Sequence, residues 1–172
     1  VLLLLHQKCA SLRSAQGLEV NKTCAMLLQK AVDSGFDGSF NSSGKVQAGK
    51  VFYELASAHL RVYLTSGLKA ERIHLKMSVQ AWKKALTYME NSVRVGAWLQ
   101  CAMAHQYLGE YKEAGIALGQ IIVNFPRFQG VEKVLFRRVM LLKRLKKFGE
   151  GKLLLSDLLM RTISGGYAKK GE

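Results

Sequence analysis

Apolar residues recur every three or four positions along most of this chain, which is the spacing of an amphipathic helix. The clearest stretch runs from Ala97 to Pro126 and divides at Leu108-Gly109. Proline cannot continue a helix, so the second half is expected to end before Pro126. The sequence therefore predicts two short helices joined by a tight turn, an αα-hairpin. The apolar face of its second helix carries Ala114, Ala117, Leu118, Ile121 and Ile122.

Weaker copies of this pattern flank the hairpin on both sides. Phe148-Gly149-Glu150-Gly151 stands 37 residues after Tyr111-Lys112-Glu113-Ala114, so a further hairpin is expected there. Its core positions are predicted at Val139 and Leu142 in the first helix and at Leu155, Leu158 and Leu159 in the second. Toward the N-terminus, the same spacing predicts two more pairs of helices. Their core positions are Phe52, Leu55, Ala56 and His59 with Ser78, Trp82, Ala85 and Leu86, and Cys24, Leu28, Ala31 and Val32 with a helix over residues 2–15.

We therefore expect an all-α fold of four helical hairpins, or eight helices. A single hairpin cannot bury its apolar face alone, so the hairpins are expected to stack. Clusters of Gly, Ser, Asn and Asp mark a loop, and chain ends without apolar residues fray. The predicted organisation is a hairpin at 1–34, a Gly- and Ser-rich loop at 35–44, a hairpin with a long inter-helix connection at 45–92, the clearest hairpin at 93–128, another hairpin at 129–163 and a frayed basic tail at 164–172.

The clearest hairpin also matches a known repeat at specific positions. These are Trp98, Ala102, Gly109-Glu110-Tyr111, Ala114, Leu118 and Pro126. In these residues the hairpin resembles the tetratricopeptide repeat (TPR) family, whose small residues let two helices approach and whose large residues fill the space between hairpins. The resemblance implies a right-handed superhelix whose concave face holds a partner protein, so it implies a scaffold or adaptor. It also implies that Trp98 is buried between helices.

The charge of the chain is strongly basic and unevenly distributed. Its 26 basic and 12 acidic residues give a net charge of +14. Between Lys133 and Lys152, eight basic residues face a single acid, Glu150. Three interpretations remain open: a solvated outer face, a groove for an acidic or C-terminal segment of a partner, or a nucleic-acid contact that gains from counterion release. No RNA-binding motif accompanies the cluster.

Two residues of this cluster suggest an anion contact. Lys133 and Arg137 are four apart, so they share one face of the predicted helix. They resemble the Lys and Arg with which some TPR domains hold a C-terminal carboxylate, and Gln100 stands where that family has Asn. Other members of that binding set are missing from the preceding hairpin, where Tyr53 and Ser57 occupy the positions. The alternative contact surface is the run of bases formed by Lys143, Arg144, Lys146 and Lys147.

Residues that would support catalysis or metal binding are sparse. No phosphate-binding Gly-rich loop, nucleophile elbow or zinc-binding His pair occurs, so no enzyme activity, metal or cofactor is predicted. The histidines stand alone in the sequence, and His59 and His105 are expected to pack inside the fold. Cys9, Cys24 and Cys101 are too scattered for a disulfide framework and are expected to act as small buried residues.

The two ends of the chain carry apolar runs. Residues 1–5 are apolar, but His6, Gln7 and Lys8 follow, so neither a membrane span nor a signal peptide is predicted. We expect a segment of a longer protein that works in the reducing cytoplasm. Because the run from Leu153 to Leu159 is apolar as well, the isolated chain is expected to self-associate in solution.

Overall fold

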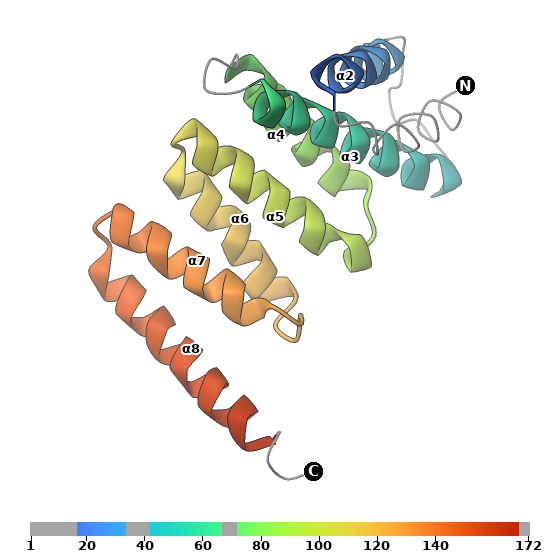
Figure 1. Ribbon diagram of the computed structural model, residues 1–172. Coiled ribbons are helices and arrows are strands. Elements are labelled where there is room, and N and C mark those ends of the chain that lie inside the picture. Colours follow the sequence, from blue (N-terminus) through green and yellow to red (C-terminus); the bar gives the residue numbers. More distant parts are fainter. Residues whose placement is uncertain (1–16, 34–41, 67–71, 169–172) are drawn as a thin grey trace. The chain divides into compact units, whose positions relative to one another are not determined.

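The computed structural model of this chain describes residues 17–33, 42–66 and 72–168. Within these ranges the regular structure is all helical, with seven helices and no strand. They divide into two compact units, one ending at Leu108 and the other beginning at Gly109. The helices are α2 (Leu18–Asp33), α3 (Ser42–Thr65), α4 (Arg72–Tyr88) and α5 (Asn91–Leu108) in the first unit, and α6 (Tyr111–Asn124), α7 (Val131–Arg144) and α8 (Phe148–Ala168) in the second (Figure 1).

The first unit is organised around α3, which packs against α2, α4 and α5. Its core includes most of the apolar positions that the sequence spacing selected in these helices, whereas Ala31 and Val32 are only half-buried. Trp82 is fully buried in this core. The rings of Tyr53 and Trp82 pack edge to face, with their centroids 4.7 Å apart. Burying a large apolar side chain stabilises a fold by about 1.5–3 kcal/mol, so this cluster dominates the stability of the unit. Other buried members are Cys24, Leu28, Phe52, Leu55, Ala56, Ala85, Leu86, Ala97 and Cys101.

One buried and one part-buried polar contact connect α4 and α2 to α3. The hydroxyl of Ser78 in α4 donates a buried hydrogen bond of 2.9 Å to the backbone carbonyl of Ala56. The Nε of Arg61 donates to the side-chain oxygen of Asn21, which is buried in α2, at 3.2 Å. Because a buried polar group without a partner costs about 1–3 kcal/mol, each contact disfavours other helix registers.

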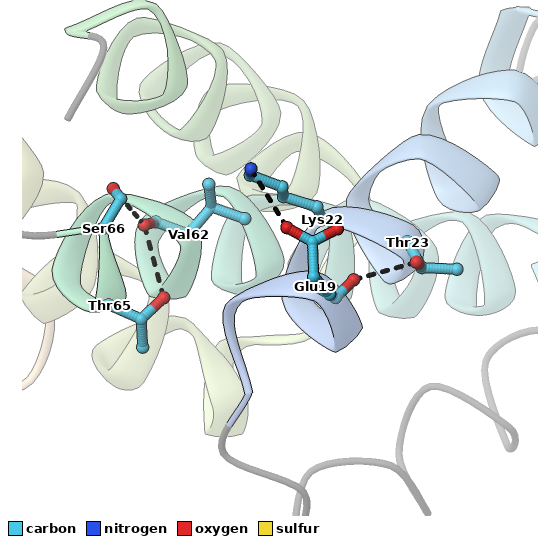
Figure 2. Close-up of polar contacts among 6 residues, drawn as sticks. All are labelled: Glu19, Lys22, Thr23, Val62, Thr65 and Ser66. Atoms are coloured by element: carbon cyan, nitrogen blue, oxygen red, sulfur yellow. Dashed lines mark hydrogen bonds and ion pairs between the residues drawn. The ribbon is translucent and has the colours of Figure 1, made fainter.

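Local hydrogen bonds define two helix ends of the first unit. Figure 2 shows Lys22 paired with Glu19 in the first turn of α2, where an acid interacts favourably with the helix dipole. At the end of α3, the hydroxyls of Thr65 and Ser66 donate to the carbonyl of Val62, at 3.4 and 2.7 Å. The Val62 carbonyl also accepts the backbone N–H of Ser66, so these hydroxyls add to a bond that is already made. The Tyr63 carbonyl, one of the last four of the helix, accepts the Ser66 hydroxyl at 3.2 Å.

In the second unit, α7 packs against α6 on one side and α8 on the other. Its buried positions are Val131, Val134, Leu135, Leu141 and Leu142. Helix α6, which packs against α7, buries Ala114, Ala117, Leu118 and Ile121, as the spacing predicted. The predicted stop is also in place, whereas the predicted turn lies at the boundary between the two units, so the hairpin over 97–126 stays a prediction. Gly109, with a φ of 81°, follows α5, and α6 ends at Asn124, two residues before Pro126.

Several expectations about boundaries are wrong. Helix α3 begins at Ser42, so the last residues of the predicted 35–44 loop are helical. Helix α8 continues to Ala168, so residues 164–168 of the predicted frayed tail are helical. The Ser and Gly residues of both segments favour loops by their intrinsic propensity. That preference is weak, and here the helices to which the segments belong continue through them. The predicted helix over 2–15 lies outside the described residues.

The predicted core of the last hairpin is also wrong in part. Leu142 is buried, but Val139 is only half-buried. In α8, Leu158 is half-buried, whereas Leu155 and Leu159 are 40% and 54% exposed. Apolar residues occupy both faces of α8, so the spacing gives no preference for one face. The side turned to α7 instead carries Gly151, which is buried; a side chain added there would meet Leu142 at an ordinary contact distance of 3.8 Å.

The tryptophan that the repeat pattern placed between helices is not fully enclosed. Trp98 is half-buried and packs against the edge of the first unit's core. The fully buried tryptophan is Trp82. We therefore correct the expectation for Trp98.

Candidate binding surface on α7

Helix α7 presents one solvent-exposed face that combines cations with large apolar side chains. Successive residues of an α-helix turn by about 100°, so Lys133, Phe136, Arg137 and Met140 fall within roughly 100° of arc. All four are exposed, and Phe136 and Met140 are 52% and 45% accessible to solvent. We call these four residues the α7 surface. It lies opposite the residues of α7 that are buried in the second unit.

The two cations of this surface are not engaged elsewhere. Among the described residues, neither Lys133 nor Arg137 makes an ion pair or a side-chain hydrogen bond. The structure therefore confirms that they share an exposed face, as the spacing predicted. A partner's carboxylate could accept two parallel hydrogen bonds from the guanidinium of Arg137 and a third from the ammonium of Lys133.

Two residues of the second predicted contact set are engaged in contacts within the protein. It consists of Lys143, Arg144, Lys146 and Lys147, which we call the basic turn, and all four are exposed. Arg144 lies over the ring of Tyr111, with 5.2 Å between its guanidinium carbon and the ring centroid, and donates to the phenol oxygen at 3.0 Å. Lys147 pairs with Glu150 at 2.6 Å. Two of the four bases thus stabilise the second unit and are less available to a ligand.

Lys146 shows how the basic turn ends α7. Its φ of 59° is a left-handed conformation that favours glycine, yet a lysine occupies it. The backbone N–H of Lys146 donates to the carbonyl of Lys143, and that of Lys147 to the carbonyl of Leu142. This pair of hydrogen bonds is the Schellman motif that closes many helices. The turn is therefore well defined, although position 146 is not the glycine that usually marks such a helix end in a sequence.

The third residue of the predicted groove, Gln100, belongs to the first unit. It lies on α5 and its side chain is half-buried. Lys133 and Arg137 lie together on one helix of the second unit, whereas Gln100 lies in the first unit. The predicted grouping of all three residues therefore stays a prediction.

Histidines that looked isolated in the sequence form a pair. His59 on α3 and His74 on α4, which have no histidine neighbour in the sequence, approach with their Nδ1 atoms 2.9 Å apart. Fifteen residues separate them, and only the packing of α3 against α4 brings them together. His59 and His105 are buried, as predicted. Within the described ranges, no three His, Cys, Asp or Glu side chains gather into a set that could hold a metal ion.

The described cysteines are buried and unpaired, as expected. Cys24 and Cys101 are free thiols with almost no exposure. Burial raises the pKa of Cys101 to about 11, although the nearby ammonium of Lys83 acts in the opposite direction. A thiol with so high a pKa is a poor nucleophile at neutral pH, so Cys101 serves packing. Cys9 lies outside the described residues.

The apolar half of the α7 surface is absent from the sequence prediction, which names only its charges. Phe136 and Met140 lie in a stretch rich in apolar residues, where most are buried, so their exposure does not follow from their type. The sequence signal that could have found them is their spacing from Lys133 and Arg137, because positions three and four apart share a face.

Comparison of the chain with known protein families, curated proteins and solved structures finds no match. None of the described helices has the combination of length and apolar character that a membrane crossing requires.

Proposed function

We propose that this chain is a protein-binding module that holds an acidic, amphipathic segment or C-terminus of a partner on the α7 surface. The observation that carries the proposal is the pairing of two unengaged cations, Lys133 and Arg137, with two exposed apolar side chains, Phe136 and Met140. Large apolar side chains exposed beside charges are typical of protein-binding sites, where the apolar groups supply affinity and the charges supply orientation.

The physical chemistry of this surface favours a peptide or helix of complementary pattern. Burying Phe136 or Met140 under a partner would contribute about 1.5–3 kcal/mol each, before the cost of ordering the partner is subtracted. The cations would attract acidic residues and set their register. A partner helix with apolar residues three and four apart and acids beside them satisfies both requirements.

The proposed architecture is a TPR-type array of four hairpins and eight helices wound into a right-handed superhelix. Its support is the resemblance of residues 93–128 to the TPR pattern, the packing of α3 on α4 and of α7 on α8 as neighbouring helices, and the short turn at Gly109. Such arrays present extended binding surfaces. We propose a scaffold or adaptor role without enzyme activity or cofactor, and a reducing compartment such as the cytoplasm suits the unpaired Cys24 and Cys101.

The alternative function is binding of nucleic acid, and one observation favours it. Eight bases between Lys133 and Lys152 face only Glu150, which would suit a phosphate backbone. Phosphate binding of this kind would weaken steeply with salt, with a log-log slope of about −0.9 per phosphate contacted on duplex DNA. A peptide held by Phe136 and Met140 would lose less affinity, because apolar contacts are not screened.

The proposal is tested by capture on the immobilised full chain from a nuclease-treated cell extract, followed by quantitative mass spectrometry. Three baits are compared: the natural sequence, Lys133→Glu/Arg137→Glu, and reversal of all four bases of the basic turn to Glu. A partner that is retained by the natural sequence and the basic-turn variant, but lost from Lys133→Glu/Arg137→Glu, supports the α7 surface. Retention by Lys133→Glu/Arg137→Glu with loss on the basic-turn variant would rule the α7 surface out.

A further inference from the structure

A second feature of the same unit is an open cavity of about 780 Å³ at the start of α7. It is lined by the segment that joins α6 to α7, the first turn of α7 and Arg161 of α8. Its cationic lining residues are Arg127, Lys133 and Arg161, and its only acid is Glu132. Three chain segments thus bring their cations to one cavity, an arrangement that no spacing in the sequence predicts.

Arg161 is held in a fixed position in this lining. Its Nε donates to the carboxylate of Asp157 at 3.0 Å, and its Nη1 donates to the backbone carbonyl of Pro126 at 3.3 Å. These contacts connect α8 to the joining segment and order a side chain that is one-third exposed. A cation that is already ordered loses less conformational entropy when it binds an anion.

The other two cations are unsatisfied within the part of the chain that the structure describes. Neither Arg127 nor Lys133 has an ion pair or a side-chain hydrogen bond there, and both are exposed. Cations that converge on one cavity repel one another, so an anion placed among them relieves the repulsion as well as adding hydrogen bonds.

The joining segment gives the cavity a defined shape and an apolar wall. Gly130 has a φ of 153°, and a side chain added there would lie 3.1 Å from the ring of Phe128. The aromatic ring therefore occupies the space that any other residue at 130 would need. Phe128 is half-buried and Val131 is buried, so the cavity offers apolar surface beside its charges. Its volume exceeds that of a single small anion.

We infer that this cavity binds a phosphorylated side chain within a segment of a partner protein. The inference rests on the proposed function and names a modification that the partner would carry. A phosphate monoester carries about −1.5 to −2 charges near neutral pH and three acceptor oxygens, which suit the cations that three chain segments bring to this cavity. The residues that flank the phosphate would lie against the half-buried ring of Phe128.

A nucleic-acid ligand fits this cavity less well. Each phosphodiester carries a single charge, and its neighbours along the strand need a row of cations. Here the cations converge on one cavity and do not form a row. Binding of a short single-stranded RNA is therefore kept as an outcome of the test.

The test uses the full chain and three probes at constant ionic strength: inorganic phosphate, N-acetyl-phosphoserine amide and a short single-stranded RNA. Binding is followed by NMR chemical shifts of the backbone amides of residues 127–133 and 161. The variants are Arg127→Gln and Lys133→Gln, and the matched control is Lys143→Gln, which removes a cation from the same helix outside the cavity. Circular dichroism shows whether each variant keeps its helices.

We expect saturable binding of both phosphate probes, with the phosphoserine amide at least as tight as inorganic phosphate. Arg127→Gln and Lys133→Gln should each weaken it about tenfold, and Lys143→Gln should leave it unchanged. The inference is overturned by linear, unsaturable shifts, by equal loss in Lys143→Gln, or by RNA that binds more tightly and displaces phosphoserine amide. The capture experiment above tests the α7 surface separately. If a partner is retained through Arg137 but neither phosphate probe binds, the cavity inference fails and the proposed function stands.

Discussion

The Nδ1 atom of His59 lies 2.9 Å from the Nδ1 atom of His74, so one imidazole must donate a proton and the other must accept it. The Nε2 atom of His59 is buried and has no hydrogen-bond partner among the described residues. If His59 donates from Nδ1, its Nε2 carries no proton and no buried N–H is left unsatisfied. We therefore assign His59 as the donor and His74 as the acceptor.

This pair makes the stability of the first unit sensitive to acid. Burial, followed by the proximity of His74, lowers the pKa of His59 from 6.5 to about 4. The fold therefore favours neutral His59, whereas the unfolded chain protonates it below pH 6.5. The contribution of His59 to the free energy of unfolding is complete above pH 6.5 and is lost as the pH falls toward 4. The loss is up to about 3 kcal/mol. Urea unfolding at several pH values between 7 and 4 measures it.

The control for acid sensitivity is His59→Gln, which cannot titrate in this range. Carboxylates also contribute to acid unfolding, but they do so equally in both proteins. The free energy of unfolding of His59→Gln should therefore fall less between pH 6.5 and 4 than that of the natural sequence. Parallel curves would show that His59 is not the titrating group.

The helical class of this fold was predictable because it depends on local spacing. The end of α6 before Pro126 and the turn at Gly109 each follow from one residue's backbone restrictions. The His59–His74 pair was not predictable, since its residues meet only when α3 packs on α4. The exposure of Leu155 could not be predicted either, because α8 is apolar on both faces.

The same distinction applies to the candidate site. The shared face of Lys133 and Arg137 follows from helical geometry alone, and the structure confirms it. The cavity at the start of α7 brings Arg161 beside Lys133 through the packing of α8, which no local pattern encodes. Local rules therefore found the charges of the site but not its shape.

The two tryptophans should contribute unequally to stability. Trp82 is fully buried, whereas Trp98 is half-buried at the edge of the same core. Trp82→Ala should cost about 3–5 kcal/mol, and Trp98→Ala should cost less, no more than about 3 kcal/mol. Urea unfolding followed by circular dichroism measures both values. A larger loss for Trp98→Ala would show that the core is centred elsewhere.

Cys101 should be protected from thiol reagents in the folded protein. Its pKa of about 11 and its burial leave very little accessible thiolate at pH 7.5. In a Cys9→Ser/Cys24→Ser background, the reaction with Ellman's reagent should be slow in buffer and fast in guanidinium chloride. Rapid reaction in buffer would contradict the buried position of the thiol.

Glycine should stabilise the end of α7 at one position and destabilise it at another. Lys146 adopts a φ of 59°, a conformation that costs a residue with a side chain roughly 1–2 kcal/mol. We expect Lys146→Gly to raise the free energy of unfolding by up to about 1 kcal/mol, because glycine relieves this strain but has a more flexible unfolded state. Lys143→Gly removes the same charge within the helix and should lower it by about 1 kcal/mol. Equal effects of the two substitutions would argue against the Schellman ending.

The isolated chain should self-associate through α8. Leu153, Leu155, Leu159, Met160 and Ile163 are all exposed on this helix. Light scattering should therefore report a concentration-dependent mass, and Leu155→Ser/Leu159→Ser should reduce it. A monodisperse monomer at all concentrations would show that this exposure has no consequence in solution.

The most direct test of the α7 surface removes its apolar groups and leaves every charge in place. The affinity of the captured partner is measured by biolayer interferometry for the natural sequence, for Phe136→Ser/Met140→Ser and for the control Ile116→Ser/Val123→Ser. Ile116 and Val123 of α6 are 63% and 74% exposed, so the control removes comparable apolar surface elsewhere in the same unit. We predict at least about a tenfold loss for the α7 variant and no loss for the control. Unchanged affinity of Phe136→Ser/Met140→Ser, or an equal loss in the control, would contradict the proposal that the partner binds on the α7 surface.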